Sequence, residues 1–268
     1  MTSPNNSTRE GRKAIAAETL EILKAGSYQF GGQTHDILAD IQAATAGTQL
    51  HKSQPDFQTR DLACQISVTQ ESTTAAIQRL HSQGRTAALN FASAQNPGGG
   101  FENGAQAQEE CLARASALYP CLLTQNEFYD IHIEEHTPLY SHITIWSPEI
   151  PFFRDEQDHL CPPFKAGILT CAAPNAARFG SDSHPVLRKT FTDRVDMVIA
   201  VAAHHAVDHL ILGAWGCGVF KNNPDTVAKI FQNTIQNCYP TQFQSITFAI
   251  FCPNGPNDTF KAFQILAP

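Results

Sequence analysis

From residue 62 onward, short runs of apolar residues alternate with longer stretches in which apolar residues recur every three or four positions. Short apolar runs bounded by turn residues predict strands, and longer periodic stretches predict amphipathic helices. The predicted strands are residues 63–69, 86–92, 143–146, 167–172, 209–212 and 246–251. The predicted helices are residues 72–83, 104–118, 185–205, 225–238 and 258–266. This alternation predicts an α/β fold of three layers, with helices covering both faces of a mixed, largely parallel sheet.

Local signals set some of these boundaries. Ser72 is expected to cap the helix that follows it, because a serine oxygen can accept from a free amide of the first turn. The helix at 104–118 is expected to end before Pro120, since proline disfavours helical backbone in the residue that precedes it. Residues 147–153 contain two prolines and are predicted as an edge hairpin, because proline cannot donate to a sheet ladder.

The first sixty residues have a different texture. Residues 9–25 predict a helix that Gly26 stops, and residues 27–60 are rich in Gln and Thr with only short apolar pieces. We expect this second stretch to be irregular. The chain is therefore divided into an N-terminal accessory segment, residues 1–60, and a main domain, residues 61–268.

The composition, with 42% hydrophobic and 16% charged residues, argues against extensive disorder. With a net charge of −7, the chain lacks the basic character of a nucleic-acid-binding protein. No run approaches the roughly 20 apolar residues that a membrane helix needs. The polar start lacks the basic and apolar parts of a secretory leader. We expect an intracellular, cytoplasmic protein (nuclear if the source is eukaryotic) that contacts neither membrane nor nucleic acid directly.

Cysteine and histidine patterns offer no metal or redox site. None of the eight cysteines shows Cys-x-x-Cys spacing, and those in apolar runs are expected to be buried free thiols. Among the eleven histidines, no run has the His-Glu-x-x-His order of the common zinc hydrolases. His204 and His205 are adjacent on a predicted helix and would point to different faces. No Gly-x-Ser-x-Gly elbow or Walker loop is present. We expect neither a metal nor another cofactor.

The most informative stretch, residues 96–110, reads N-P-G-G-G-F-E-N-G-A-Q-A-Q-E-E. Consecutive glycines let the backbone approach a ligand closely and expose amide donors. Carboxylates beside such a loop suit acid/base chemistry on a sugar or a phosphorylated ligand. The alternative is a flexible loop before a solvated helix start, where glutamate is favoured by the helix dipole. The glycines are Gly98, Gly99 and Gly100, and the polar triplet is Gln108, Glu109 and Glu110.

A second glycine-containing loop, residues 213–220, reads G-A-W-G-C-G-V-F and directly follows a predicted strand. Successive amides in such a loop can bind a pyrophosphate, although a tight strand-to-helix turn would need the same glycines. Both loops follow strands, so both should lie at the carboxyl edge of the sheet, where ligands of such folds bind. The amides expected to face the anion are those of Gly216, Cys217, Gly218 and Val219.

Three glycines followed after six to eight residues by Gln-Glu-Glu resemble the signature of the poly(ADP-ribose) glycohydrolases, whose catalytic domain is an elaborated macrodomain. The N-P-G-G-G form and the length are similar to the bacterial-type branch of this family. Residues 213–220 resemble the diphosphate loop of macrodomains, and residues 172–175 also look like this family. The resemblance implies a macrodomain-like catalytic domain with an N-terminal helical extension.

The resemblance also implies roles for individual residues. Glu110 would protonate the leaving ribose oxygen and then activate water, while Glu109 would orient the sugar hydroxyls. Asn96 would bind the ribose at the scissile bond, Gln108 would support the local helix and loop, and Phe220 would lie against the distal ribose. Adenine is expected near residues 68–73, where helix capping by Ser72 is an equal explanation. Asn175 would touch the ligand or cap a turn.

The implied function is hydrolysis of the ribose–ribose O-glycosidic bonds of poly(ADP-ribose), which releases ADP-ribose and reverses ADP-ribosylation in the DNA damage response. The expected partners are the polymer and ADP-ribosylated proteins, and the chain is expected to be a monomer. Two rival functions stay open: removal of single ADP-ribose units from a protein or nucleobase, and non-catalytic reading of ADP-ribose. A reader would need the second loop but would have no use for Gln-Glu-Glu.

Overall fold

The computed structural model describes residues 6–180 and 185–267; most of the polar start considered above lies outside them. Its centre is a seven-stranded sheet with the order β3-β6-β7-β5-β8-β9-β4. The five strands from β7 to β4 are parallel, and β6 is antiparallel to both β3 and β7. The strands are β3 (Gln49–His51), β4 (Gln65–Thr69), β5 (Thr86–Phe91), β6 (Thr144–Arg154), β7 (Leu160–Cys171), β8 (His209–Leu212) and β9 (Ser245–Ala249). The predicted mixed, largely parallel sheet is confirmed.

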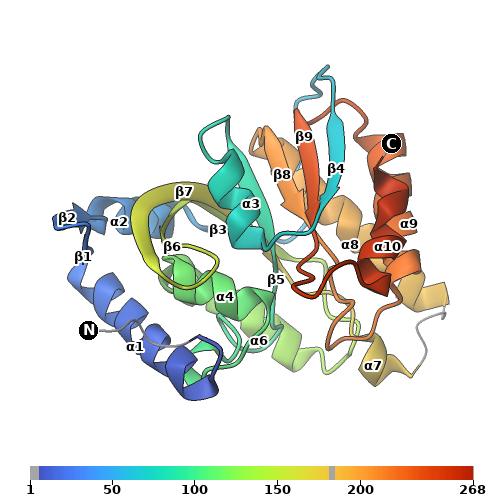
Figure 1. Cartoon of the computed structure of the whole chain (residues 1–268). Helices are drawn as coiled ribbons and strands as arrows, with labels where there is room; N and C mark the ends of the chain where they lie inside the picture. The colour runs from blue at the N-terminus through green and yellow to red at the C-terminus, as the bar shows by residue number, and fades with distance from the viewer. Residues whose placement is uncertain (1–5, 181–184, 268) are drawn as a thin grey trace.

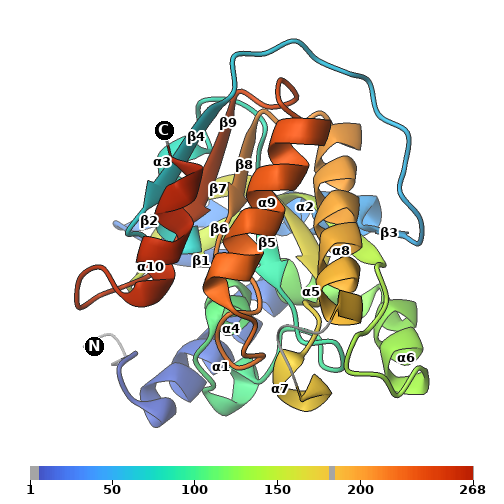
Figure 2. The same cartoon turned by 90° about the vertical axis from the view of Figure 1, so that its right-hand side faces the viewer.

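Helices cover both faces of this sheet, as Figures 1 and 2 show. On one face, α8 (Pro185–His204), α9 (Pro224–Cys238) and α10 (Asp258–Phe263) bury one apolar core. On the other face, a second core lies under α2 (Leu38–Gly47), α3 (Thr73–Leu80), α4 (Gln108–Ala115), α5 (Leu118–Leu123) and α6 (Asn126–Glu134). Alternate residues of β5 serve the two cores, because successive side chains of a strand point to opposite faces: Leu89 packs in the first core and Ala88 in the second.

The N-terminal helix α1 (Arg9–Ala25) has the predicted bounds and ends at Gly26, whose φ of 70° is left-handed. The prediction that residues 27–60 are irregular is wrong for most of this stretch. It contains a hairpin of β1 (Ser27–Phe30) and β2 (Gln33–Asp36), then α2, and then β3, which pairs with β6. The Gly-Gly turn between β1 and β2 is a hairpin signal that the sequence analysis overlooked. The division of the chain at residue 60 stays a prediction.

The edge hairpin predicted at residues 147–153 is also wrong. These residues belong to β6, which pairs along its length with β7, and the register shifts between Ser147 and Ile150. Beyond this bulge no second strand of the described residues pairs with β6, because β3 pairs only with residues 144–146 and the remaining contact is a single bridge from Ser116 to Phe152. The prolines are therefore tolerated on the unpaired side of the strand. Because β7 pairs with β6 along its length, β7 begins at Leu160, well before the predicted residue 167.

The helix predicted at 104–118 is shorter and is followed by another. A short 3₁₀ turn (Phe101–Asn103) precedes α4, which covers only residues 108–115. Ser116 is extended, with φ of −150°, and bridges to Phe152 of β6. Pro120 lies in the first turn of α5, where its missing N–H breaks no helical hydrogen bond. The sequence analysis also missed α6. No helix within residues 6–180 and 185–267 combines the length and apolarity that crossing a bilayer requires.

Candidate functional site

A cleft of about 870 Å³ opens beyond the carboxyl ends of β5, β8 and β9. Its walls include residues 91–95 after β5, residues 214–220 after β8, residues 249–251 after β9, and residues 106–112 at the start of α4. The two stretches singled out in the sequence, residues 96–110 and residues 213–220, thus both contribute to the cleft at one edge of the sheet. This edge is where parallel α/β sheets bind their ligands.

Glu109 lines this cleft but is only 3% exposed. One carboxyl oxygen accepts from Asn90 Nδ2 at 3.2 Å, and the other accepts from the Ser93 amide at 2.6 Å. The pKa of Glu109 is raised to about 8, mainly by burial and to a lesser degree by the charge of Glu110. The hydrogen bonds oppose this rise because they favour the carboxylate. Burial thus shifts Glu109 towards its protonated form, while its hydrogen bonds oppose that shift.

Glu110 lines the same cleft and is half-buried. Its Oε1 accepts from the backbone amide of Gly100 at 3.0 Å. Gly99 lies beneath both carboxyl groups: a Cβ at this position would be 2.3 Å from Glu110 Oε1 and 3.2 Å from Glu109 Oε2. With φ of 61°, Gly99 also has a left-handed backbone. The position therefore requires glycine both for space and for conformation.

The triple glycine thus contacts the carboxyl groups of Glu109 and Glu110, and Gly98, Gly99 and Gly100 form no part of the cleft wall. Asn96 is exposed, also lies outside the wall, and accepts from the Gly99 amide through its carbonyl at 2.9 Å. Its contact with a ribose stays a prediction.

Gln108 does line the cleft, and its side chain ties α4 to neighbouring elements. Its Oε1 accepts from the Phe91 amide at 2.8 Å, and its Nε2 donates to Leu89 O at 2.8 Å and to Thr73 Oγ1 at 3.1 Å. This amide group therefore joins the start of α4 to β5 and α3, in the supporting position that the resemblance implies.

The second loop keeps several amides unused. Within the described residues, the backbone amides of Gly216, Gly218, Val219 and Phe220 donate to no acceptor. The Cys217 amide is the exception among the predicted anion donors, because it donates to Ala214 O at 3.1 Å. Free amides on one loop form the kind of concavity that binds anions.

Asn222 fixes the shape of this loop from behind. Its Nδ2 donates to Pro174 O at 2.8 Å and to Gly216 O at 3.0 Å. Gly216 has φ of 73°, and a Cβ there would lie 2.5 Å from that nitrogen. Val219, at the tip, is 80% exposed. The Cys217 thiol lines the cleft, and burial raises its pKa to about 12, so it is not a reactive thiolate.

The cleft wall holds five carboxyl groups and, within the described residues, no lysine or arginine. Two of these groups are Glu109 and Glu110, and three come from the turn between β6 and β7: Asp155, Glu156 and Asp158. The negative charge of an anionic ligand would therefore have to be stabilised by the amides of the second loop. Such binding suits a diphosphate cradled by backbone.

Some cleft residues were not found from the sequence. Tyr140 has a left-handed φ of 56°, and its ring lies 6.1 Å from that of Phe220. Its carbonyl accepts from Arg194 of α8 at 2.8 Å. This contact spans 54 residues, so no local pattern could reveal it. Other cleft residues missed from the sequence include Asp155, Glu156, Asp158, Phe251, Asn257 and Thr259.

The region expected to bind adenine is only partly in the wall. Of residues 68–73, Ser72 and Thr73 line the cleft, and Ser72 also caps α3 by accepting from the Ala75 amide at 3.1 Å. Asn175 caps the short helix α7 (Ala176–Phe179) and lies outside the wall. Two roles were expected for Asn175, a ligand contact or a cap, and the structure shows the cap.

Histidines and cysteines form no metal cluster in the part of the chain that the structure describes. His204 Nδ1 bonds to Asp56 O at 2.6 Å, and His205 Nε2 lies 3.0 Å from His51 Nε2. Both are therefore engaged in hydrogen bonds.

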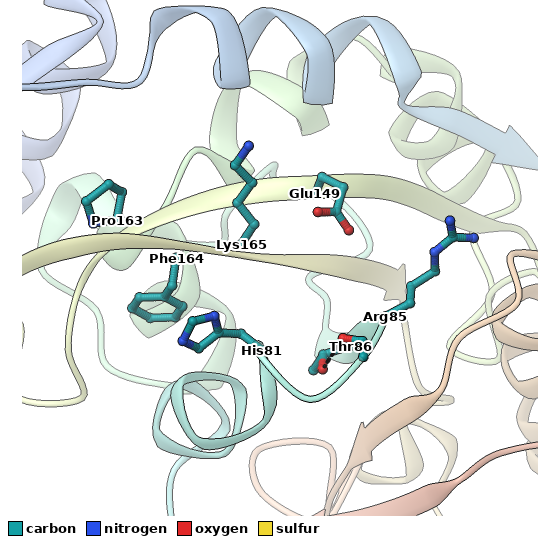
Figure 3. Close-up of a pocket in the computed structure, with 8 residues that line it drawn as sticks. His81, Arg85, Thr86, Glu149, Pro163, Phe164 and Lys165 are labelled. Atoms are coloured by element: carbon teal, nitrogen blue, oxygen red, sulfur yellow. Dashed lines mark hydrogen bonds between the residues drawn. The ribbon is translucent and has the colours of Figure 1, made fainter.

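A second depression of about 540 Å³ lies where β5 begins, at the opposite edge of the sheet from the cleft (Figure 3). Its charged side chains carry both signs, and Lys165 and Arg85 already have partners within the protein. Lys165 pairs with Asp40 of α2, Arg85 donates to His205 O at 2.8 Å, and Glu149 is anionic. This depression lacks the paired carboxyl groups of the larger cleft.

A family model for the microbial-type PARG catalytic domain matches residues 16–155. A crystal structure of poly(ADP-ribose) glycohydrolase (PARG) from Thermomonospora curvata is 38% identical, with a TM-score of 0.88, and the match covers 96% of this chain and 99% of that one. The same organism's enzyme bound to the inhibitor ADP-HPD matches with a TM-score of 0.87, at the same identity and coverage. PARG from Deinococcus radiodurans in complex with ADP-ribose is 34% identical, with a TM-score of 0.76, over 89% of this chain and 97% of that one. No curated protein matches this sequence.

Proposed function

Because the chain belongs to the family of microbial-type PARG catalytic domains, we propose that it hydrolyses the ribose–ribose bonds of poly(ADP-ribose) and releases ADP-ribose. The observation that carries this proposal is a half-buried Glu110 in the same cleft as four unused amides of the second loop. A sugar attached to a diphosphate held by those amides would have its anomeric carbon near a carboxyl group.

Glu110 is the general acid and base in this proposal. It gives a proton to the leaving ribose oxygen as the C–O bond breaks, and it then accepts a proton from the water that attacks the anomeric carbon. Its partial exposure supports this role, since a carboxyl group must reach the substrate. Glu109 is buried and hydrogen-bonded, which suits a residue that orients sugar hydroxyls and holds its neighbour in place.

The diphosphate is bound by the amides of Gly216, Gly218 and Val219, and Phe220 packs against the distal ribose. Asn96 contacts the ribose at the scissile bond, after a side-chain rearrangement on binding. The reaction needs no metal or other cofactor in this proposal, because a carboxyl group supplies both proton transfers.

The physiological substrates in this proposal are polymer-carrying proteins, and the enzyme acts as a cytoplasmic monomer without direct contact to nucleic acid. Its biological role is the reversal of ADP-ribosylation after DNA damage. The N-terminal segment, residues 1–60, accompanies the catalytic domain, residues 61–268.

The test compares the parent protein with Glu110→Gln on purified poly(ADP-ribose), with ADP-ribose quantified by chromatography. The parent should release ADP-ribose, and the variant should turn over about 10²–10⁴-fold more slowly. Calorimetry should show that the variant still binds ADP-ribose, which separates loss of chemistry from loss of folding.

A substrate carrying single ADP-ribose units makes the test selective. Faster cleavage of that substrate than of the polymer would favour the mono-ADP-ribosyl hydrolase. Binding of ADP-ribose without any release by the parent would identify a non-catalytic reader.

A further inference from the structure

Arg114, in the last turn of α4, is completely buried. Its guanidinium donates to Ala105 O at 3.0 Å and to Gln106 Oε1 at 2.6 Å, and its Nε lies 3.3 Å from Asp158 Oδ1. Helical side chains point back towards the N-terminus of their helix, so Arg114 returns to the residues just before its own helix. It thereby connects the loop before Gln108 with the turn between β6 and β7.

A second set of contacts connects α4 to the N-terminal helix. Thr19 Oγ1 of α1 donates to Arg114 O at 2.7 Å and accepts from Arg154 Nε at 3.3 Å. Arg154 also donates to Asp158 O at 2.9 Å and pairs with Glu18 at 2.6 Å. Three separate parts of the chain (α1, α4, and the end of β6 with the turn that follows it) are therefore joined in one largely buried polar network.

The start of α4 lacks the usual local support. Its N-cap is Ala107, which has no side chain that can accept from the first turn. The first-turn carboxyl groups of Glu109 and Glu110 are used instead by amides of the loop after β5. The position of this turn is therefore set by contacts other than a cap, namely the hydrogen bonds of Gln108 to β5 and α3 and those that hold the loop before the helix.

Helix α1 also holds the loop that leads into α4, and Figure 1 shows the two elements side by side. Arg9 Nε donates to Asn103 O, and Arg12 Nε donates to Gly104 O, both at 2.9 Å. Gly104 has no room for a side chain, because a Cβ there would lie 2.3 Å from Arg9 O. The accessory helix is thus closely fitted to the catalytic segment.

We propose that Arg114 is a positioning residue through which α1 and the β6–β7 turn hold Glu109 and Glu110 in their reactive placement. The inference rests on the proposed function and assigns a catalytic purpose to the N-terminal segment. It acts by geometry: Arg114 does not touch the substrate, and it fixes the backbone from which the two carboxyl groups project.

The test uses Arg114→Lys, which keeps the charge but cannot make the planar fork of contacts. We expect kcat on the polymer to fall at least tenfold, because a displacement of about 1 Å can reduce a rate by 10². The dissociation constant for ADP-ribose should stay within about threefold of the parent value, since the second loop is untouched. A residue that only stabilises the fold would lower the melting temperature and leave kcat per folded molecule unchanged.

Thr19→Val is the second variant, and it guards against misfolding of the first. It keeps the volume of a fully buried side chain and removes one contact to Arg114, at a site that does not line the cleft. We expect a smaller fall in kcat, of about two- to fivefold, in the same direction. The matched control is Arg60→Lys, which breaks a clamp to Asp208 and Val207 O at the opposite edge of the sheet. This control should lose stability without losing kcat.

A measurement that does not depend on turnover completes the design. The carboxyl carbon of Glu109 is titrated by NMR, with its signal assigned by its absence in Glu109→Gln. In Arg114→Lys and Thr19→Val, the midpoint should move towards that of an exposed glutamate as the start of α4 shifts, and Arg60→Lys should leave it in place.

A parent protein that releases no ADP-ribose would defeat the proposed function, while shifted titrations would still support positioning by Arg114. Conversely, an active parent with unchanged kcat and unchanged titration in both network variants would overturn the positioning role alone.

Discussion

The two glycine-containing loops of the cleft follow neighbouring parallel strands, β5 and β8, and yet they are organised in opposite ways. In the first, the amides of Gly99 and Gly100 are already hydrogen-bonded, to Asn96 O and to Glu110. In the second, the amides of Gly216, Gly218, Val219 and Phe220 donate to no described residue. The first loop therefore binds the protein's own acids, and the second leaves free the amides to which we assign the diphosphate. Gly99 and Gly216 both leave no room for a side chain, whereas a Cβ at Gly218 would meet nothing within 4 Å.

The largest effect is expected from Gly99→Ala. The new Cβ would lie 2.3 Å from Glu110 Oε1, and the position has φ of 61°, so the carboxyl groups must move. We expect kcat to fall by about 10²-fold or more, with a smaller change in affinity for ADP-ribose. Steady-state kinetics on the polymer checks this.

The matched control for that variant is Gly31→Ala, with φ of 58° and nothing within 4 Å of the new Cβ. It imposes a similar backbone strain, of roughly 1 kcal/mol, without a clash. Equal losses of activity in the two variants would mean that strain, and not displacement of the carboxyl groups, is responsible.

The buried acid of the first loop gives the next prediction. The pKa of Glu109 is raised from 4.5 to about 8, so the folded protein holds this proton more tightly than the unfolded chain does. Its contribution to stability is complete below pH 4.5 and is lost as the pH rises through about 8. Glu109→Gln has no such proton to lose. The free energy of unfolding of the variant, relative to the parent, should therefore increase between pH 5 and pH 8, on the order of 2–3 kcal/mol.

Denaturant unfolding of both proteins at several pH values measures this difference. The difference between variant and parent cancels the contribution of other titrating groups. One of them is His205, because burial lowers its pKa to about 4 and its protonation therefore destabilises the fold at acid pH. A difference that stays constant with pH would mean that Glu109 is not held in its protonated form.

The comparison of the loops also shows what a sequence can predict. The alternation of strands and helices was sufficient for the fold, because each of the parallel strands β5, β8 and β9 carries its own apolar signal. The meeting of residues 98–110 with residues 213–220 followed from the edge rule for such sheets. The sequence did not show which amides of the second loop are free. The Cys217 amide donates within a turn, whereas the Gly218 amide donates to no described residue. Tyr140 and β3 were missed because their placement depends on distant partners, Arg194 and β6.

A moderate effect is expected from Gly216→Ala in the second loop. The new Cβ would lie 2.5 Å from Asn222 Nδ2 and 2.8 Å from Ala173 Cβ, at φ of 73°. Loop distortion should raise KM and the dissociation constant for ADP-ribose about tenfold, because several amides must converge on one diphosphate. The rate constant kcat should change less than KM, in contrast to Gly99→Ala. Gly32→Ala, with φ of 76° and an open Cβ position, is the control for strain.

The smallest effect, and the sharpest distinction between the loops, is expected from Gly218→Ala. A Cβ at this position meets nothing within 4 Å, and the backbone is not left-handed, so the free protein should keep its melting temperature. The added methyl group can therefore lower only the affinity for a ligand that approaches the neighbouring amides. We expect KM to rise about threefold, the scale of one imperfect contact of roughly 0.6 kcal/mol, with kcat unchanged. Calorimetry with ADP-ribose, alongside thermal unfolding of the free protein, separates the two effects. An unchanged dissociation constant would mean that the diphosphate lies elsewhere, and a lowered melting temperature would mean that this glycine, like Gly99, is needed by the fold itself.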